Sequence, residues 1–269
     1  MSLKKTSVLC ILISTILLIS CDKTQEFNTT MTGSNSHKLN TSENDFQKSW
    51  TGKPYWIRLE NNLVFKIPAQ FTAFWILKDH PEIILSESRP ASVPLVIALG
   101  FSMFMPNFQG YTADNFLNEF DENEIKVLSI EPASGASTEP GAPGSYPPNQ
   151  FYRLQKYGVI DPSKFEDKYG LRCYDEKPFD KDMGPIQICY GMRDASLDEY
   201  IPLRVYMPPY SVNAKFPIMQ TTYFTKKYGG LEITWRAHAK HFSHWKEIDS
   251  QISKYIDQWN MTEDSHVSR

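Results

Sequence analysis

Apolar and polar positions divide the chain into three stretches. Residues 8–19 are apolar except for one serine and one threonine, and residues 22–49 are rich in Asn, Thr and Ser. From Trp50 onward, apolar positions recur with the spacings typical of strands and helices, so a folded body is expected there. The middle stretch has too few apolar residues to bury a core and is predicted to be a disordered tether.

The first part of the folded body, residues 50–131, contains mainly strand patterns. Two alternating runs in residues 55–68 flank Asn61-Asn62, which predicts a hairpin. Residues 94–106 are mostly apolar and β-leaning, which indicates a buried strand. Residues 124–132 alternate and predict a further strand.

The second part, residues 150–262, continues the strand pattern. Strands are predicted at residues 150–158, 171–176, 186–193 and 201–208. Residues 220–239 give the clearest hairpin, with its turn at Lys227-Tyr228-Gly229-Gly230.

Two helices are predicted. Thr112 is the expected N-cap of a short helix with Phe116, Leu117 and Phe120 on one face. Ser243 is the expected N-cap of a longer C-terminal helix. The apolar residues of this second helix follow at helical spacing: Trp245, Ile248, Ile252, Tyr255, Ile256 and Trp259. Its polar residues are predicted to face mostly outward: Lys246, Glu247, Asp249, Lys254 and Asp257.

These elements predict an α+β fold, a predominantly antiparallel β-sheet with the C-terminal amphipathic helix packed on one face. Residues 132–149 are rich in Pro, Gly and Ser, and form either a long loop or a boundary between two similar-sized halves. The expected organisation is a leader, a lipidated cysteine with its tether, two halves around the loop, and a tail: residues 1–20, 21–49, 50–131, 132–149, 150–262 and 263–269.

The N-terminal run has the features of a secretory signal. Lys4 and Lys5 precede an apolar segment that is shorter than the roughly 20 residues of a membrane-spanning helix. The segment ends in Leu18-Ile19-Ser20-Cys21, which resembles the bacterial lipobox. The resemblance implies cleavage before Cys21, lipidation of its thiol and display in the periplasm, on either the inner or the outer membrane. A conventional signal peptide cut elsewhere, with Cys21 free, is the alternative.

Net charge and cysteine content indicate which ligands and bonds to expect. Loss of Lys4 and Lys5 with the leader takes the formal net charge from −3 to −5, which argues against binding nucleic acid through a basic surface. In an oxidising compartment, Cys173 and Cys189 are expected to form a disulfide, two free buried thiols being the alternative. Neither has a second Cys or His at ligand spacing, so no metal site and no cofactor are predicted.

Two clusters of residues are candidates for a metal site or a catalytic site. His238, His241 and His244 recur every third residue, but they fall at a strand end and a helix start, which separates them. Ser243 and Lys246 match an S-x-x-K motif without its accompanying elements, and a helix cap explains Ser243 better. We therefore predict no catalytic residues and no enzymatic activity.

Residues 221–260, together with the lipobox, the polar tether and the β-rich body, resemble lipoprotein immunity proteins paired with bacterial type VI secretion lipase effectors. The resemblance implies a membrane-anchored, periplasm-facing protein that binds a phospholipase toxin and blocks it. The effector-binding residues are unknown, and residues 132–149 are the candidate loop for part of the interface. Two alternatives stay open: an envelope lipoprotein that binds a ligand or assembles a complex, and an envelope hydrolase without a recognised motif.

Overall fold

The computed structural model describes Trp50 and residues 52–112, 115–116, 121–133, 147–177, 184–208 and 216–262. The leader, Cys21, the tether, residues 134–146 of the predicted loop and the tail at 263–269 lie outside these described residues. So does most of the short helix predicted after Thr112.

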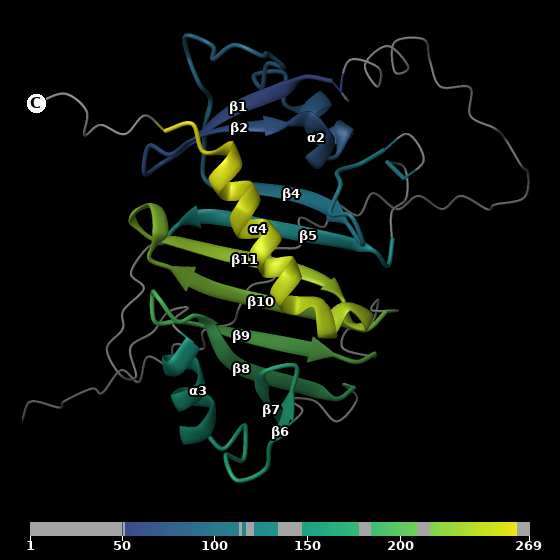
Figure 1. Cartoon of the computed structure of the whole chain (residues 1–269), viewed down its shortest axis with the longest axis vertical. Helices are drawn as coiled ribbons and strands as arrows, with labels where there is room; N and C mark the ends of the chain where they lie inside the picture. Colours follow the sequence, from purple (N-terminus) through teal and green to yellow (C-terminus); the bar gives the residue numbers. More distant parts are fainter. Residues whose placement is uncertain are drawn as a thin grey trace, which may run out of the picture. The chain divides into compact units, whose positions relative to one another are not determined.

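An eight-stranded antiparallel sheet forms the centre of the fold (Figure 1). Its strand order is β4-β5-β11-β10-β9-β8-β7-β6, and every neighbouring pair is antiparallel. The strands are β4 (Leu99–Phe104), β5 (Glu124–Pro132), β6 (Glu166–Lys168), β7 (Leu171–Glu176), β8 (Ile186–Asp194), β9 (Glu199–Tyr206), β10 (Ile218–Thr225) and β11 (Leu231–His238). Strand β5 of the first predicted half pairs with β11 of the second, so the two halves share one sheet.

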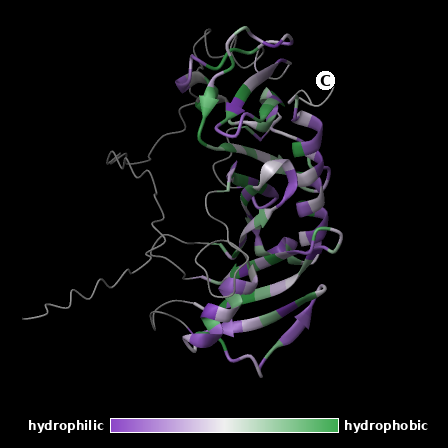
Figure 2. Ribbon diagram, turned by 90° about the vertical axis from the view of Figure 1, so that its left-hand side faces the viewer, coloured by the Kyte–Doolittle hydropathy of each residue, from purple (hydrophilic) through white to green (hydrophobic). Residues whose placement is uncertain are grey.

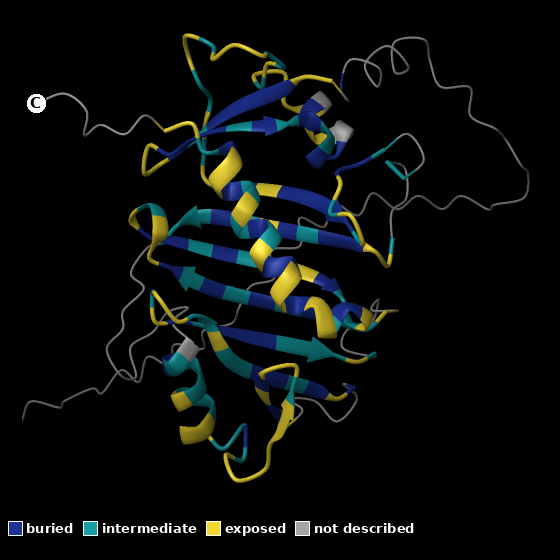
Figure 3. Cartoon of the chain, viewed as in Figure 1, coloured by how far each residue is buried: buried dark blue, intermediate teal, exposed yellow. Residues whose placement is uncertain are grey.

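The C-terminal helix α4 (Trp245–Trp259) packs across one face of this sheet, which confirms the predicted α+β arrangement (Figure 1). Five of its apolar side chains are buried: Trp245, Ile248, Ile252, Ile256 and Trp259. Strands β10 and β11 alternate between buried and partly exposed positions, and their buried residues lie under the helix (Figure 3). Each large side chain buried in this way contributes about 1.5–3 kcal/mol to stability.

The start of α4 differs from the prediction in two respects. Ser243 is not the N-cap, because it lies inside the 3-10 helix η3 (Ala239–His244), which runs directly into α4. The Trp245 N–H therefore donates to the carbonyl of Phe242 rather than to a capping side chain. Asp249 does not face outward: it is buried, because it lies on the same face of the helix as Trp245 and Ile252.

A three-stranded sheet, ordered β2-β1-β3, contains the predicted first hairpin. Strands β1 (Pro54–Leu59) and β2 (Val64–Pro68) are antiparallel, and Asn62 has the left-handed backbone (φ 68°) that asparagine tolerates in a turn. The predicted single strand at 94–106 is instead two strands: β3 (Leu95–Val96) joins this small sheet, and β4 begins the large one.

Aromatic packing attaches the small sheet to α4. The chain after β2 forms η1 (Ala69–Phe71) and then α2 (Phe74–Asp79). The Phe71 ring lies 4.9 Å from both Tyr255 and Trp259, measured between ring centroids. The Val64 carbonyl also accepts from the Met261 N–H at 2.7 Å, just after α4 ends. The C-terminal helix is thus fastened to both sheets.

The strand predicted at residues 150–158 is wrong, because Pro147–Lys156 forms helix α3. Proline is favoured in the first turn of a helix, where its missing N–H costs nothing, so Pro147-Pro148 begins this helix well. Phe151 and Leu154 then lie one turn apart and pack on Ile188 and Tyr174. Because Ile188 alternates with Cys189, which belongs to the core under α4, helix α3 lies on the opposite face of the sheet.

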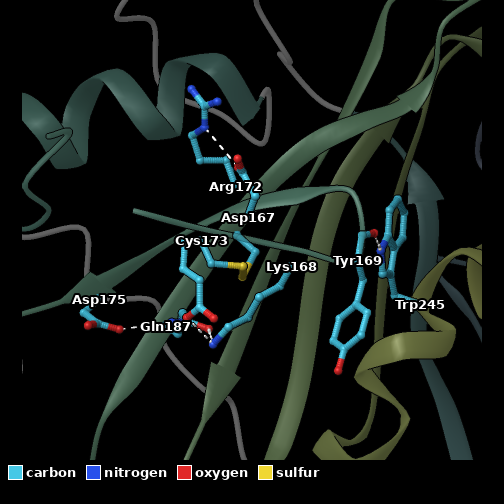
Figure 4. Close-up of a disulfide and its surroundings, with 10 residues drawn as sticks. Asp167, Lys168, Tyr169, Arg172, Cys173, Asp175, Gln187 and Trp245 are labelled. Atoms are coloured by element: carbon cyan, nitrogen blue, oxygen red, sulfur yellow. Dashed lines mark hydrogen bonds and ion pairs between the residues drawn. A yellow bond between two sulfur atoms is a disulfide. The ribbon is translucent and has the colours of Figure 1, made fainter. Parts of the chain in front are cut away.

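Strands β7 and β8 contain the disulfide between Cys173 and Cys189, which occupy directly paired positions (Figure 4). Nearby, the indole N–H of Trp245 donates to the carbonyl of Tyr169 at 3.0 Å, which joins the start of α4 to the β6–β7 turn. Within the described part of the chain, no helix has the length and apolar character needed to cross a membrane.

Candidate functional site

The candidate site is the sheet face opposite α4, which we call the open face. In β11, Ile233 and Trp235 are buried under α4, whereas Glu232, Thr234 and Arg236 alternate with them and point the other way. Figure 2 views the molecule from the side, with α4 along one side of the sheet. The partly or fully exposed side chains of the open face include Lys126, Ser129, Glu131, Arg204, Gln220, Thr222, Phe224, Glu232, Thr234 and Arg236.

Strand register arranges these side chains in three rows across β5, β11, β10 and β9. One row places Lys126, Arg236, Gln220 and Arg204 side by side. The middle row contains Ser129, Thr234 and Thr222, and the hydroxyls of Thr222 and Thr234 are hydrogen-bonded at 2.9 Å. The third row contains Glu131, Glu232 and Phe224. The face is therefore basic along one side and acidic along the other.

A cavity of about 560 Å³ lies beside the open face, between α3 and strands β7 to β9. Four aromatic residues line it: Phe151, Tyr174, Tyr190 and Tyr200. Burial raises the pKa of the Tyr190 hydroxyl, which has no hydrogen-bond partner among the described residues. Arg172 and Asp167 lie at its rim and form an ion pair at 3.3 Å. The cavity can accept an apolar or aromatic group.

A buried ionic network lies under α4, on the other face of the sheet. The Arg193 guanidinium donates to Glu199 at 2.6 Å and to Ser253 at 2.7 Å, and pairs with Asp249 at 2.8 Å. It also stacks over the Tyr223 ring at 4.4 Å. Although burial opposes its charge, Tyr223, Asp249 and Glu199 together raise the pKa of Arg193. This network was not predicted from the sequence, although Asp249 lies four residues after Trp245, on the apolar face of α4.

The three histidines make separate contacts. The His238 ring accepts from the backbone N–H of Lys240 at 3.0 Å, and His244 contacts Glu247 at 3.2 Å. His241 is buried and its Nε2 lies 3.0 Å from the carbonyl oxygen of Glu122. Burial lowers the pKa of His241, and the Glu122 carbonyl offsets this only in part. Among the described residues, no group of three or more His, Cys, Asp or Glu side chains is placed to hold a metal ion.

The remaining sequence candidates are Ser243 with Lys246 and the loop at residues 132–149. Ser243 lies in η3, and the Lys246 ammonium lies 5.4 Å from the centre of the Trp245 ring. Pro132 ends β5 and Pro147 begins α3, so the candidate loop between them connects the sheet to the helix beside the aromatic cavity.

Comparisons with known proteins give few matches. No protein-family model matches the chain, and no curated protein matches it either. Two solved structures are similar to it. One is the iron-regulated outer membrane lipoprotein FrpD of Neisseria meningitidis, at 9% identity and a TM-score of 0.49, with 79% of this chain and 94% of that chain covered. The other is Smlt3025, an immunity protein of the Stenotrophomonas maltophilia type IV secretion system, at 11% identity and a TM-score of 0.48, with 78% and 94% covered. At these values, neither similarity supports an argument about function.

Proposed function

We propose that this chain is a lipid-anchored envelope protein that faces the periplasm and neutralises a toxin effector by binding it. The observation that carries the proposal is the end of the apolar leader, Leu18-Ile19-Ser20-Cys21, followed by a polar stretch and then the folded body. An inhibitor tethered at a membrane is concentrated where a membrane-directed toxin acts. Lipidation of Cys21 supplies such a tether, because several acyl chains give stable attachment where one does not.

The structure supports a binding role through its open face. A stoichiometric inhibitor needs a rigid, complementary surface with polar and aromatic groups. The open face supplies charged rows on a sheet whose opposite side is fixed by α4, and the aromatic cavity adjoins it. The effector class in this proposal is a type VI secretion phospholipase. That choice rests on the resemblance of residues 221–260, which form most of β10 and all of β11, η3 and α4.

The test is to purify a candidate phospholipase effector encoded near this gene and to measure whether the lipoprotein binds and inhibits it. The lipoprotein, purified from membranes in detergent, is expected to co-purify with the effector at a fixed ratio and to abolish its lipase activity. The activity should fall linearly with added lipoprotein until the two are equimolar. Absence of both a complex and inhibition at micromolar concentrations would reject the proposal.

The aromatic cavity favours a second candidate, an envelope lipoprotein that binds a small ligand. Its volume of about 560 Å³ lies within the usual range for small-molecule sites. This candidate predicts that the purified lipoprotein carries a small molecule in stoichiometric amount, detectable by native mass spectrometry. The same measurement on a Tyr200→Ala variant should show a lower occupancy, since that substitution removes one of the aromatic rings that line the cavity.

A further inference from the structure

Two pairs of like charges oppose each other on the open face. Glu131 of β5 lies directly across from Glu232 of β11, and Lys126 of β5 lies directly across from Arg236 of β11. Directly opposed residues of antiparallel strands have Cβ atoms roughly 4.5–5.5 Å apart, and like charges at such positions are destabilising. The sheet therefore carries electrostatic repulsion at two places on the same pair of strands.

The acidic pair is the less compensated of the two. Among the described residues, no basic side chain forms an ion pair with Glu131 or Glu232. Burial and the neighbouring Glu232 both raise the pKa of Glu131. In the basic pair, Lys126 contacts Glu124 at 3.1 Å, whereas Arg236 is exposed and has no ion-pair partner among the described residues. Each pair thus keeps charge that a binding partner can neutralise.

The acidic and basic pairs are separated along the strands, so the face has an acidic end and a basic end. Glu232 and Arg236 are four residues apart on β11, which corresponds to roughly 13 Å along a strand. Thr234 lies between them and offers a hydroxyl. Across the strands, the face extends from β5 to β9, and the aromatic cavity continues it to β7. Adjacent strands are about 4.8 Å apart, so this span is roughly 24 Å, comparable to one side of a standard protein interface.

We propose that the open face is the docking surface for a protein partner that sets a basic group against Glu131 and Glu232 and an acidic group against Lys126 and Arg236. This inference rests on the proposed function, in which the partner is the effector. Opposite charges from the partner relieve the repulsion that the free sheet retains, so the pairs favour the complex over the free protein. They also fix the orientation of docking and reject partners with the reverse arrangement of charge.

The experiment compares two properties of Glu232→Gln in the full-length lipoprotein in detergent. Removing one charge of the pair is expected to raise the midpoint of thermal unfolding of the free protein by about 1–3 °C. The same change is expected to weaken binding to the purified neighbouring phospholipase on the order of 10-fold, and Glu232→Lys on the order of 100-fold. A residue with a purely structural role does not show this opposition between stability and binding.

Arg236→Glu tests the basic pair, and Glu60→Gln is the matched control. Arg236→Glu is expected to weaken binding on the order of 10-fold or more and to reduce the salt dependence of the association rate. Glu60 is an exposed glutamate in the turn directly after β1, outside the open face, so its substitution should change neither binding nor thermal stability.

The outcomes separate the two proposals. If the wild-type lipoprotein does not bind the phospholipase, the proposed function is rejected and this inference falls with it. If the wild type binds and the Glu232 and Arg236 variants bind equally well, the inference alone is overturned. A lower unfolding midpoint for Glu232→Gln would show that the acidic pair is not repulsive, which also overturns it. Attachment of the wild type to phosphatidylglycerol vesicles through Arg236, with effector binding unaffected, would assign the face to lipid instead.

Discussion

At the scale of single residues, the buried side chain of Arg193 connects one strand to two others and to the C-terminal helix. It comes from the end of β8 and contacts Glu199 of β9, Tyr223 of β10 and Asp249 of α4. Its side chain is only 6% exposed. Two buried carboxylates therefore share one cation, and loss of that cation leaves both of them without an opposite charge.

Arg193→Met is expected to lower the free energy of unfolding by about 3–5 kcal/mol, because it leaves buried Glu199 and Asp249 unpaired. Chemical denaturation followed by tryptophan fluorescence measures the loss. Arg172→Met is the control, since the Arg172–Asp167 pair is exposed and pairs of that kind contribute about 0–1 kcal/mol. Equal losses for the two variants would contradict the structural importance of the network.

Burial of His241 is expected to make the stability of the protein depend on pH. Burial lowers its pKa below the ordinary value of 6.5, so the unfolded chain binds more protons than the folded chain between those two values. Its contribution to stability is therefore fully present above about pH 6.5 and is lost as the pH falls through the lowered pKa. Thermal unfolding of the wild type should show a midpoint that decreases from pH 7.5 to pH 5.

His241→Gln should flatten this decrease, even though it also removes the contact with the Glu122 carbonyl and lowers stability throughout. The diagnostic quantity is the slope of the unfolding midpoint against pH, not its absolute value. His238, whose pKa burial also lowers, is expected to account for part of the remaining slope. Identical slopes for the wild type and His241→Gln would refute this assignment.

At the scale of elements, strong periodicity allowed the sheet and its covering helix to be predicted. The β10–β11 hairpin alternates without interruption for eight residues in each strand, and Gly229-Gly230 ends its turn with positive φ angles. Five apolar residues of α4 recur at helical spacing, so that segment could be predicted as a helix. Local pattern was sufficient here because each element buries one continuous face.

Helix α3 and the Asp249 network were not predicted, for physical reasons that differ. In residues 147–156, the apolar residues packed on the Ile188 cluster are Phe151 and Leu154, and Tyr152 remains 49% exposed. Two contacts one turn apart are too few to distinguish a helix from a short aromatic strand. The burial of Asp249 depends on Arg193, which is 56 residues earlier in the chain, and no local pattern contains that partner. The rows of the open face likewise required the strand register.

The disulfide gives a prediction at this scale. Cys173 and Cys189 are 16 residues apart in sequence, and they join β7 to β8 near the short edge strand β6. In the chain-entropy account, a loop of this length contributes about 3 kcal/mol by restricting the unfolded chain. The double variant Cys173→Ala/Cys189→Ala should lose about 2–4 kcal/mol in denaturant unfolding. A reductant should lower the stability of the wild type by a similar amount and leave the double variant unchanged.

At the scale of the whole molecule, the proposed protein has an acylated N-terminus that a polar stretch connects to the folded body and its binding surface. A flexible chain with the length of residues 22–49 has a root-mean-square reach of roughly 30 Å. That reach is enough to place the predicted anchor at the lipid surface while the folded body meets its partner beside it. Anchoring therefore changes the local concentration of the body and leaves its intrinsic affinity for the partner the same.

The Cys21→Ala variant distinguishes the effect of anchoring on local concentration from the intrinsic affinity for the partner. The variant should incorporate no labelled palmitate and should retain its leader, whereas Cys10→Ala, which alters only the leader, should be labelled and cleaved as the wild type is. In detergent, the folded body of Cys21→Ala should inhibit the effector as strongly as the wild type, because the open face is unchanged. Cells that produce the variant should nevertheless survive the effector less well, since an unlipidated body is not held at the membrane by acyl chains. Full protection by an unlipidated protein would show that neutralisation does not depend on the anchor, and recovery of unlabelled wild type from the cytosol would remove the basis of the envelope assignment.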